Sequence, residues 1–173
     1  MDMYRLSLTF TIGIFALAGC GPREPSRALG PVELKPVAAS ELDGIIEHEK
    51  GKVVFAEVWF YGCAPCRKKF PHLVKLHEAH AKDGLVVLSI DVEPNDMEHS
   101  SSIEKFLREN EADFSHYIIM KNDQARSDWL KKYSIRSTPT FLAFDRSGKQ
   151  VNVPEPASAD DVDAFLSKLL EEK

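Results

Sequence analysis

Two cysteines separated by two residues, Cys63 and Cys66, follow closely on a strongly apolar run. This run, Val53 to Phe60, is rich in valine and aromatic side chains, which favours a buried strand. Apolar residues then recur near helical spacing up to Lys82, which predicts a helix that begins at about the first cysteine. At the start of a helix the dipole and the free amide groups favour a negatively charged sulfur. The spacing also allows the two cysteines to form a disulfide across one tight turn.

Strand and helix patterns alternate along the rest of the chain. Ser40 and Ser158 are expected to cap the first and last helices, and Ser101 and Glu104 form a capping box between them. This order predicts an α/β domain with a mixed central sheet flanked by helices. The expected elements are a helix from 40 to 50, strands at 53–60 and 85–91, a polar loop at 94–99, a helix at 101–110, a strand at 114–120, a helix at 124–133, a hairpin at 140–153 and a helix from 158.

The N-terminus carries an apolar run of 13 residues, from Leu6 to Ala18. A membrane span needs about 20 residues, whereas this length suits the hydrophobic region of a secretory signal. The run ends in Leu-Ala-Gly-Cys20, which resembles the lipobox of bacterial lipoproteins. That resemblance implies a signal peptide at 1–19, cut before Cys20, and a diacylglycerol on the Cys20 sulfur. The alternatives are an ordinary signal peptide with an incidental cysteine, or an uncleaved anchor.

The segment after the expected lipid site, 20–36, contains four prolines and two glycines. Proline fixes its backbone and lacks an amide donor, so this segment reads as an extended linker. The folded domain is then expected at 37–173. With Cys20 on lipid, the chain's other two cysteines are Cys63 and Cys66. The net charge of −5 argues against a nucleic-acid binder, which would carry a basic surplus.

The segment from Val53 to Pro71 resembles the active-site segment of thioredoxins. Glu57 lies six residues before the first cysteine, where thioredoxins carry a buried aspartate. Trp59 matches an aromatic position of the family, and Pro71 matches its helix-kinking proline. The likeness therefore extends beyond the two cysteines to the strand and the helix around them.

A second segment, Tyr133 to Phe141, is similar to the thioredoxin signature in which Pro139 would be cis. Between the two segments the chain has an additional helix and strand, at about Ser101 to Met120. This insertion is typical of TlpA/ResA-like lipoprotein and periplasmic thioredoxins. The chain is thus identified as a thioredoxin-like protein, and the resemblance implies a thioredoxin-like fold with an extra helix–strand insertion over residues 40–171.

The resemblance assigns roles to the matching residues. Cys63 would be the nucleophile that attacks a substrate disulfide, and Cys66 the buried thiol that resolves the mixed disulfide. Glu57, beneath the pair, would take the proton from Cys66, because burial raises the pKa of a carboxyl group toward neutrality.

The same resemblance predicts a substrate-binding surface beside the cysteines. Pro139 would face the disulfide, so that the backbone of Thr138 could pair with a substrate strand. Ala64 and Pro65, between the cysteines, would contact substrate as well.

Four residues depart from the family pattern. Glu57 replaces the usual aspartate, Gly62 a common tryptophan, and Ala64 a glycine or glutamate. Lys69 stands where the ResA type has a functional glutamate.

These features predict a lipid-anchored thiol–disulfide oxidoreductase of the bacterial cell envelope that reduces protein disulfides and faces the periplasm or the exterior. The exterior is oxidising, so a transmembrane thiol donor is the expected source of electrons. Expected substrates are protein thiols and disulfides, with apocytochrome c as one candidate. We expect a monomer without a cofactor or a bound metal.

Alternative interpretations of the cysteine pair remain open at the level of the sequence. The pair could be a structural disulfide, or half of a zinc site, although zinc would need a second pair of ligands. A thioredoxin fold could also serve as a copper-binding assembly factor, with both thiols and a histidine holding copper(I). His77 and His80, three residues apart on one expected helix, are a further possible metal pair.

Overall fold

The computed structural model describes residues 32–121, 123–154 and 158–172. Cys20, the expected signal peptide and most of the expected linker lie outside these residues. The described part forms a six-stranded sheet with the strand order β1-β4-β3-β2-β5-β6. Its strands are β1 (Leu34–Val37), β2 (Val53–Trp59), β3 (Leu85–Asp91), β4 (Ser115–Ile119), β5 (Thr140–Phe144) and β6 (Gln150–Val151). Its helices are α1 (Ala39–His48), α2 (Ala64–His80), α3 (Ser100–Glu109), α4 (Arg126–Lys132) and α5 (Ala159–Glu171), with short 3₁₀ helices η1 (Ala81–Asp83) and η2 (Pro94–His99).

Strand β2 lies inside the sheet, parallel to β3 on one side and antiparallel to β5 on the other. All of its residues are buried because helices cover both faces of the sheet. Such a strand needs no alternation of apolar and polar residues, which explains the continuous apolar run in the sequence. The mixed α/β architecture expected from the sequence is therefore confirmed.

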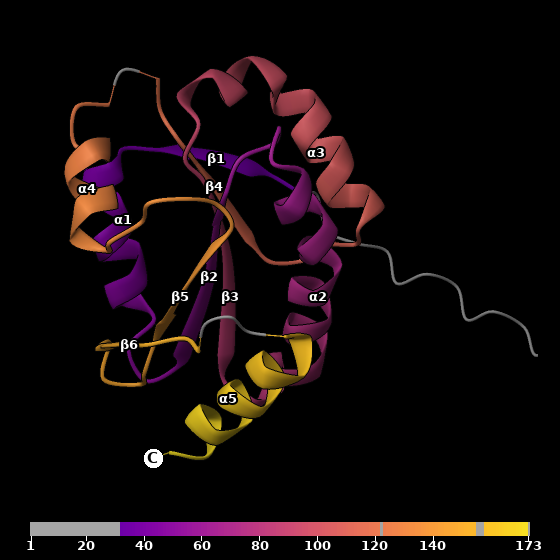
Figure 1. The fold of residues 1–173 in the computed structure, drawn as a ribbon, viewed down its shortest axis with the longest axis vertical. Coiled ribbons are helices and arrows are strands. Elements are labelled where there is room, and N and C mark those ends of the chain that lie inside the picture. The colour runs from indigo at the N-terminus through magenta and orange to yellow at the C-terminus, as the bar shows by residue number, and fades with distance from the viewer. Residues whose placement is uncertain (1–31, 122, 155–157, 173) are drawn as a thin grey trace, which may run out of the picture.

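Helices α2, α3 and α5 cover one face of the sheet, and α1 and α4 cover the other (Figure 1). Successive residues of β2 point to opposite faces. Phe55 and Trp59 pack in the core beneath α2, whereas Val54 and Val58 pack in the core beneath α1. By this alternation Glu57, between Phe55 and Trp59, belongs to the α2 face. The sheet thus directs this carboxyl group toward the helix that carries the cysteine pair.

The fold begins earlier than the sequence indicates. Strand β1 starts at Leu34, so the last residues of the expected linker are part of the sheet. It runs parallel to β4 at the edge of the described sheet. Pro36, which has no amide donor, is tolerated there because no further strand of the described sheet pairs with the outer side of β1. Proline therefore marked the edge of the sheet here rather than a linker.

Two expected helix caps are wrong. Helix α1 starts at Ala39 rather than after Ser40, and the Ala39 amide donates to the carboxylate of Asp123, far along the chain. Helix α3 starts at Ser100 without a side-chain cap, because the 3₁₀ helix η2 runs directly into it and places Ser101 inside the helix. By contrast, Ser158 caps α5 in a capping box with Asp161, as expected.

Candidate active site

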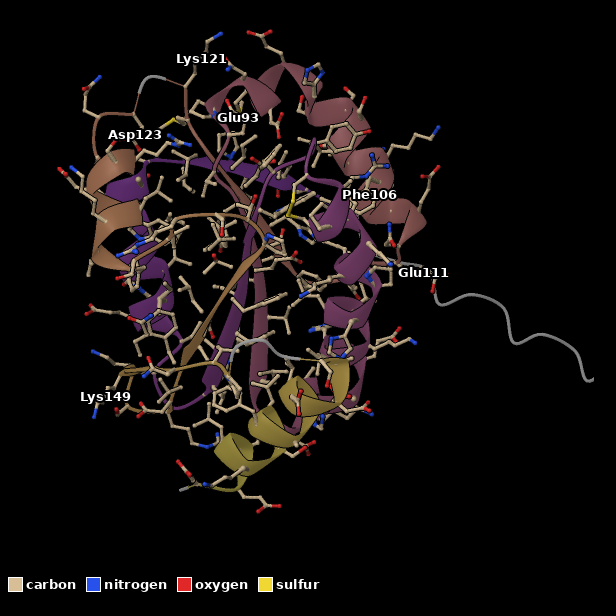
Figure 2. The ribbon with its side chains drawn as sticks, viewed as in Figure 1. Glu93, Phe106, Glu111, Lys121, Asp123 and Lys149 are labelled. Atoms are coloured by element: carbon tan, nitrogen blue, oxygen red, sulfur yellow. A yellow bond between two sulfur atoms is a disulfide. The ribbon has the colours of Figure 1, made fainter. Side chains whose placement is uncertain are left out.

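Cys63 and Cys66 are joined in a disulfide at the start of α2, with their Cα atoms 5.3 Å apart (Figure 2). Cys63 is the N-cap of the helix, and its sulfur accepts a hydrogen bond from the amide of Cys66 at 3.2 Å. Pro65 fits the first turn because a helix makes no use of its amide there. Cys63 is 5% exposed and Cys66 is completely buried. Cys63 is therefore the less buried residue of the pair.

Three cations follow the cysteines within one turn of α2. The guanidinium of Arg67 lies over the rings of Tyr61 and Phe106, at 5.0 and 5.2 Å from their centroids. The ammonium of Lys69 lies 5.6 Å from the centroid of Phe141, and Lys68 is exposed between them. Positive charge at a helix N-terminus opposes the dipole, so these side chains weaken the helix while they favour a negative sulfur nearby.

Glu57 is completely buried beneath α2. Neither oxygen of its carboxyl group has a hydrogen-bond partner within the described residues. Burial raises the pKa of Glu57 to about 8, and the nearby charge of Lys69 offsets part of this rise. A carboxyl group with such a pKa is mostly protonated at pH 7 and can both give and accept a proton close to neutrality.

The peptide bond between Thr138 and Pro139 is cis. Strand β5 begins directly after it, and the antiparallel register places Thr140 opposite Val58 near the end of β2. Because the chain leaves β2 to enter the cysteine turn, this register brings the cis peptide and the cysteine turn to the same edge of the sheet. The two segments singled out in the sequence therefore meet there, as the resemblance implies.

A cavity of about 350 Å³ adjoins the cysteine turn, between α2 and the start of α5. Pro65, which stands between the two cysteines, forms part of its wall. Lys68, Lys69 and His72 line it from α2, and Ser158 lines it from α5. The remaining lining residues are Phe55, Leu73, Leu76, Phe141, Ala159 and Val162. The cavity is therefore mainly apolar, with cations along the α2 side.

Sequence reasoning missed two buried carboxyl groups behind the cysteine turn. Asp96 accepts a hydrogen bond from the amide of Tyr61 at 2.6 Å, which fixes the segment just before Cys63. Asp91, completely buried, accepts one from the amide of Glu93 at 2.9 Å. Burial raises the pKa of Asp91 to about 8, and the nearby Asp96 adds to this. Asp91 ends an expected strand, but the sequence gives no sign that Asp96 folds back against Tyr61.

Within the described ranges, no group of three or more histidine, cysteine, aspartate or glutamate side chains is arranged to hold a metal ion. In the same residues, no helix combines the length and the apolar character needed to cross a membrane. His72, on the helix of the cysteines, bonds to Asp163 of α5 at 2.9 Å. The Nδ1 atom of His80 lies 3.5 Å from a carboxylate oxygen of Asp83.

Comparison with curated proteins finds relatives described as thiol-disulfide oxidoreductase ResA. The protein from Geobacillus kaustophilus is 27% identical over 122 residues, which cover 69% of this chain and 64% of the relative. The protein from Geobacillus thermodenitrificans is 30% identical over 114 residues, or 64% of this chain and 60% of the relative. That from Halalkalibacterium halodurans is 26% identical over 151 residues, or 86% of this chain and 77% of the relative.

The chain is similar to these ResA proteins of the thioredoxin-like group. It spans about three fifths of the length of the two Geobacillus relatives. No protein-family model matches it.

Solved structures support the fold of this ResA-like chain. The thioredoxin domain of a thiol-disulfide oxidoreductase from Bacteroides vulgatus matches with a TM-score of 0.59 and 26% identity, over 72% of this chain and 83% of that domain. A thiol-disulfide isomerase from Corynebacterium glutamicum matches with a TM-score of 0.62 and 22% identity, over 82% and 91% of the two chains. The thioredoxin-like fold expected from the sequence is thus confirmed.

Proposed function

We propose that this protein is a thiol–disulfide oxidoreductase that reduces disulfides in other proteins through Cys63 and Cys66. The observation that carries the proposal is the pairing of the two sulfurs at the start of α2, the helix that covers the face of the sheet with the buried, protonatable carboxyl group of Glu57. The ResA relatives, which are described as thiol-disulfide oxidoreductases, support the same activity.

Reduction of a substrate would start from the dithiol form of the protein. The Cys63 thiolate attacks one sulfur of the substrate disulfide, a mixed disulfide forms, and the substrate's other sulfur leaves as a thiolate that takes up a proton. The Cys66 thiol then loses its proton and attacks the Cys63 sulfur. The substrate's second sulfur leaves and is protonated in turn. The substrate gains two electrons and two protons, and the protein is left with the observed disulfide.

Glu57 would exchange the proton of Cys66. In its ionised form it accepts the proton as Cys66 attacks. In its protonated form, which prevails at pH 7, it returns a proton to Cys66 when an external dithiol reduces the disulfide again. One buried carboxyl group can therefore serve both halves of the cycle. Thr138 and Pro139, at the same edge of the sheet, would pair with the substrate backbone, and Ala64 and Pro65 would contact it.

The test is the reduction of insulin disulfides by the purified protein, with dithiothreitol as the electron source. The wild-type protein should accelerate precipitation of the insulin B chain, and Cys63→Ser should abolish this acceleration. Pre-reduced Cys66→Ser, freed of dithiothreitol and mixed with insulin, should instead accumulate a mixed disulfide with the substrate, visible by mass spectrometry. Equal rates for the wild-type protein and Cys63→Ser would refute the proposal.

The direction of electron flow is tested by the equilibrium redox potential of the cysteine pair. A reductase should lie near the value of about −270 mV found for thioredoxin, and a strong oxidant near about −120 mV. A value close to the second would exclude the reductase role. A membrane protein that supplies electrons, and apocytochrome c as a substrate, are the partners proposed here.

Location in the cell envelope is part of the proposal. The Leu-Ala-Gly-Cys20 sequence supports cleavage after residue 19 and a lipid on Cys20. More than one acyl chain would be needed there, because a single chain gives marginal, reversible membrane binding. Mass spectrometry of the mature N-terminus should find acylated Cys20. Processing should stop in Cys20→Ser or in the presence of globomycin.

A further inference from the structure

We propose that the cavity between α2 and α5 binds an apolar side chain of the protein substrate that is followed by an acidic residue, and so selects the disulfides that Cys63 attacks. This inference rests on the proposed function and deepens it, because it names the class of substrate sequence.

The cavity has the size and lining of a side-chain pocket. Its volume of about 350 Å³ lies at the lower end of the range for ligand sites, which suits one large apolar side chain. Phe55 and Phe141 wall it from the sheet, and Leu73, Leu76 and Val162 wall it from the helices. Burial of an apolar side chain against these groups is favourable because it removes apolar surface from water.

The cavity lies next to the cysteine pair. Pro65 lies between the cysteines in sequence and also lines the cavity. A substrate strand rises about 3.3 Å per residue. A substrate cysteine at Cys63 would therefore place a side chain two or three residues away at the cavity.

The charges around the cavity favour an acidic neighbour for that side chain. Lys68 and Lys69 both line the α2 side, are exposed, and make no ion pair with any residue in the described ranges. The cation–π contact with Phe141 holds the ammonium of Lys69 above the apolar wall. A carboxylate beside the docked side chain could pair with either lysine.

Three carboxyl groups near the cavity, among the residues that the structure describes, have partners or are buried. The carboxylate of Asp163 contacts the ring nitrogen of His72 at 2.9 Å. Asp161 is held in the capping box of Ser158. Glu57 is buried and mostly protonated at pH 7. Within the described lining, the two lysines are therefore charged groups without a carboxylate partner, and the exposed Asp160 at the start of α5 is not among the lining residues.

The first experiment compares two synthetic peptides with one intramolecular disulfide. They are identical except that a leucine two residues after the second cysteine is followed by glutamate or by lysine. Each is mixed with pre-reduced protein, quenched with acid, and followed by mass spectrometry over a single turnover. The glutamate peptide should react about two- to fivefold faster at low salt, the range expected for exposed ion pairs. Salt should reduce this preference.

Variants assign the preference to the rim. Lys68→Gln combined with Lys69→Gln should make the two peptides react at equal rates. Lys75→Gln, an exposed lysine of the same helix outside the cavity, is the matched control and should keep the preference. Equal rates of the two peptides with the wild-type protein would overturn the proposal. A preference that survives removal of both rim lysines would overturn it as well.

A second pair of variants tests the cavity itself. Ala159→Phe should fill its mouth from α5, and Ala79→Phe introduces the same ring at an exposed position of α2 outside the cavity. The rate with the leucine peptide, divided by the rate with neutral dithiodipyridine for the same variant, should fall several-fold for Ala159→Phe alone. An unchanged ratio would refute the docking site.

Failure of the proposed activity gives a different result. A protein without the proposed activity would reduce neither peptide, even where its thiols react with the smaller and more activated dithiodipyridine. The docking site is then tested by binding of cysteine-free versions of both peptides, measured as NMR shift changes at the cavity residues. Shifts that favour the glutamate peptide support the site, and absence of shifts overturns it, whatever the redox chemistry.

Discussion

The amide of Cys66 donates a hydrogen bond to the sulfur of Cys63 across 3.2 Å, so the first turn of α2 points a donor at the more exposed sulfur of the pair. A sulfur that accepts such a bond at a helix N-terminus is stabilised in its negative form. The same backbone turn that closes the disulfide therefore prepares one of its sulfurs for attack.

Reduced Cys63 should consequently react with iodoacetamide much faster than Cys66 at pH 7. The helix start and the cations of α2 favour its thiolate, whereas Cys66 is completely buried. Peptide mapping after brief alkylation measures the two rates separately. The same treatment in a denaturant serves as the control and should label both cysteines. Comparable labelling of both in the folded protein would contradict this account.

Glu57→Gln should make the oxidised protein more stable at neutral and alkaline pH. The pKa of Glu57 is about 8 in the folded protein and close to its usual value of 4.5 when unfolded. The folded state therefore holds a proton that the unfolded state has lost, and the wild type loses stability as the pH rises from about 4.5 to 8. The gain for Glu57→Gln should be small at pH 4 and roughly 2–4 kcal/mol at pH 8.

Urea unfolding of both proteins across this pH range measures the effect. Asp91 has the same direction of shift, so part of the pH slope should remain in Glu57→Gln and decrease further when Asp91→Asn is added. A gain that is independent of pH would show that Glu57 does not hold the extra proton.

Asp43→Ala should destabilise the fold by about 1–3 kcal/mol, because one carboxylate joins α1 to α4 through three donors. It accepts hydrogen bonds from the indole of Trp129 at 3.2 Å and the hydroxyl of Tyr133 at 2.7 Å, and it also contacts Lys132. Thermal unfolding measures the loss. Asp128→Ala, an exposed residue of α4 paired with Lys131, should change stability by less than about 0.5 kcal/mol. Equal effects would refute the role of Asp43.

Arg146→Met should also destabilise the protein by about 1–3 kcal/mol. Its guanidinium donates to the carbonyls of Gly51 and Asp83, and to those of Leu170 and Glu172 at the end of α5. Faster amide exchange in α5 is expected as well. Lys149→Met is the control, since Lys149 is exposed on the same hairpin and is not the donor in any of these bonds (Figure 2). Unchanged amide exchange rates in α5 would contradict the role of Arg146 in holding the end of that helix.

The sequence predicted the parts of the fold that depend on local pattern. The strand β2 and the helix cap at Ser158 could be predicted because neighbouring residues in the sequence determine them. The start of β1 and the cap of α1 were not, because both depend on partners far along the chain. Strand β1 needs β4, and the Ala39 amide needs Asp123.

In the candidate active site, too, the features that depend on local sequence could be predicted and those that depend on distant contacts could not. The cysteine pair and Pro139 carry motif signals that a sequence displays directly. The contact of Asp96 with the Tyr61 amide and the cation–π contact of Lys69 with Phe141 arise from tertiary folding. In the sequence, Lys69 is visible only as a departure from the family pattern. Its place at the rim of a cavity depends on the position of α5 beside α2, which the sequence does not display.

The complete burial of Cys66 has a kinetic consequence for any partner held on Cys63. In the folded state Cys66 cannot be approached by a second partner, so its attack on the mixed disulfide takes place within one molecule. The rate of that step does not depend on the concentration of the protein or of its partners. Burial of Cys66 thus confines exchange between molecules to Cys63 and prevents one protein from being cross-linked to two partners at once.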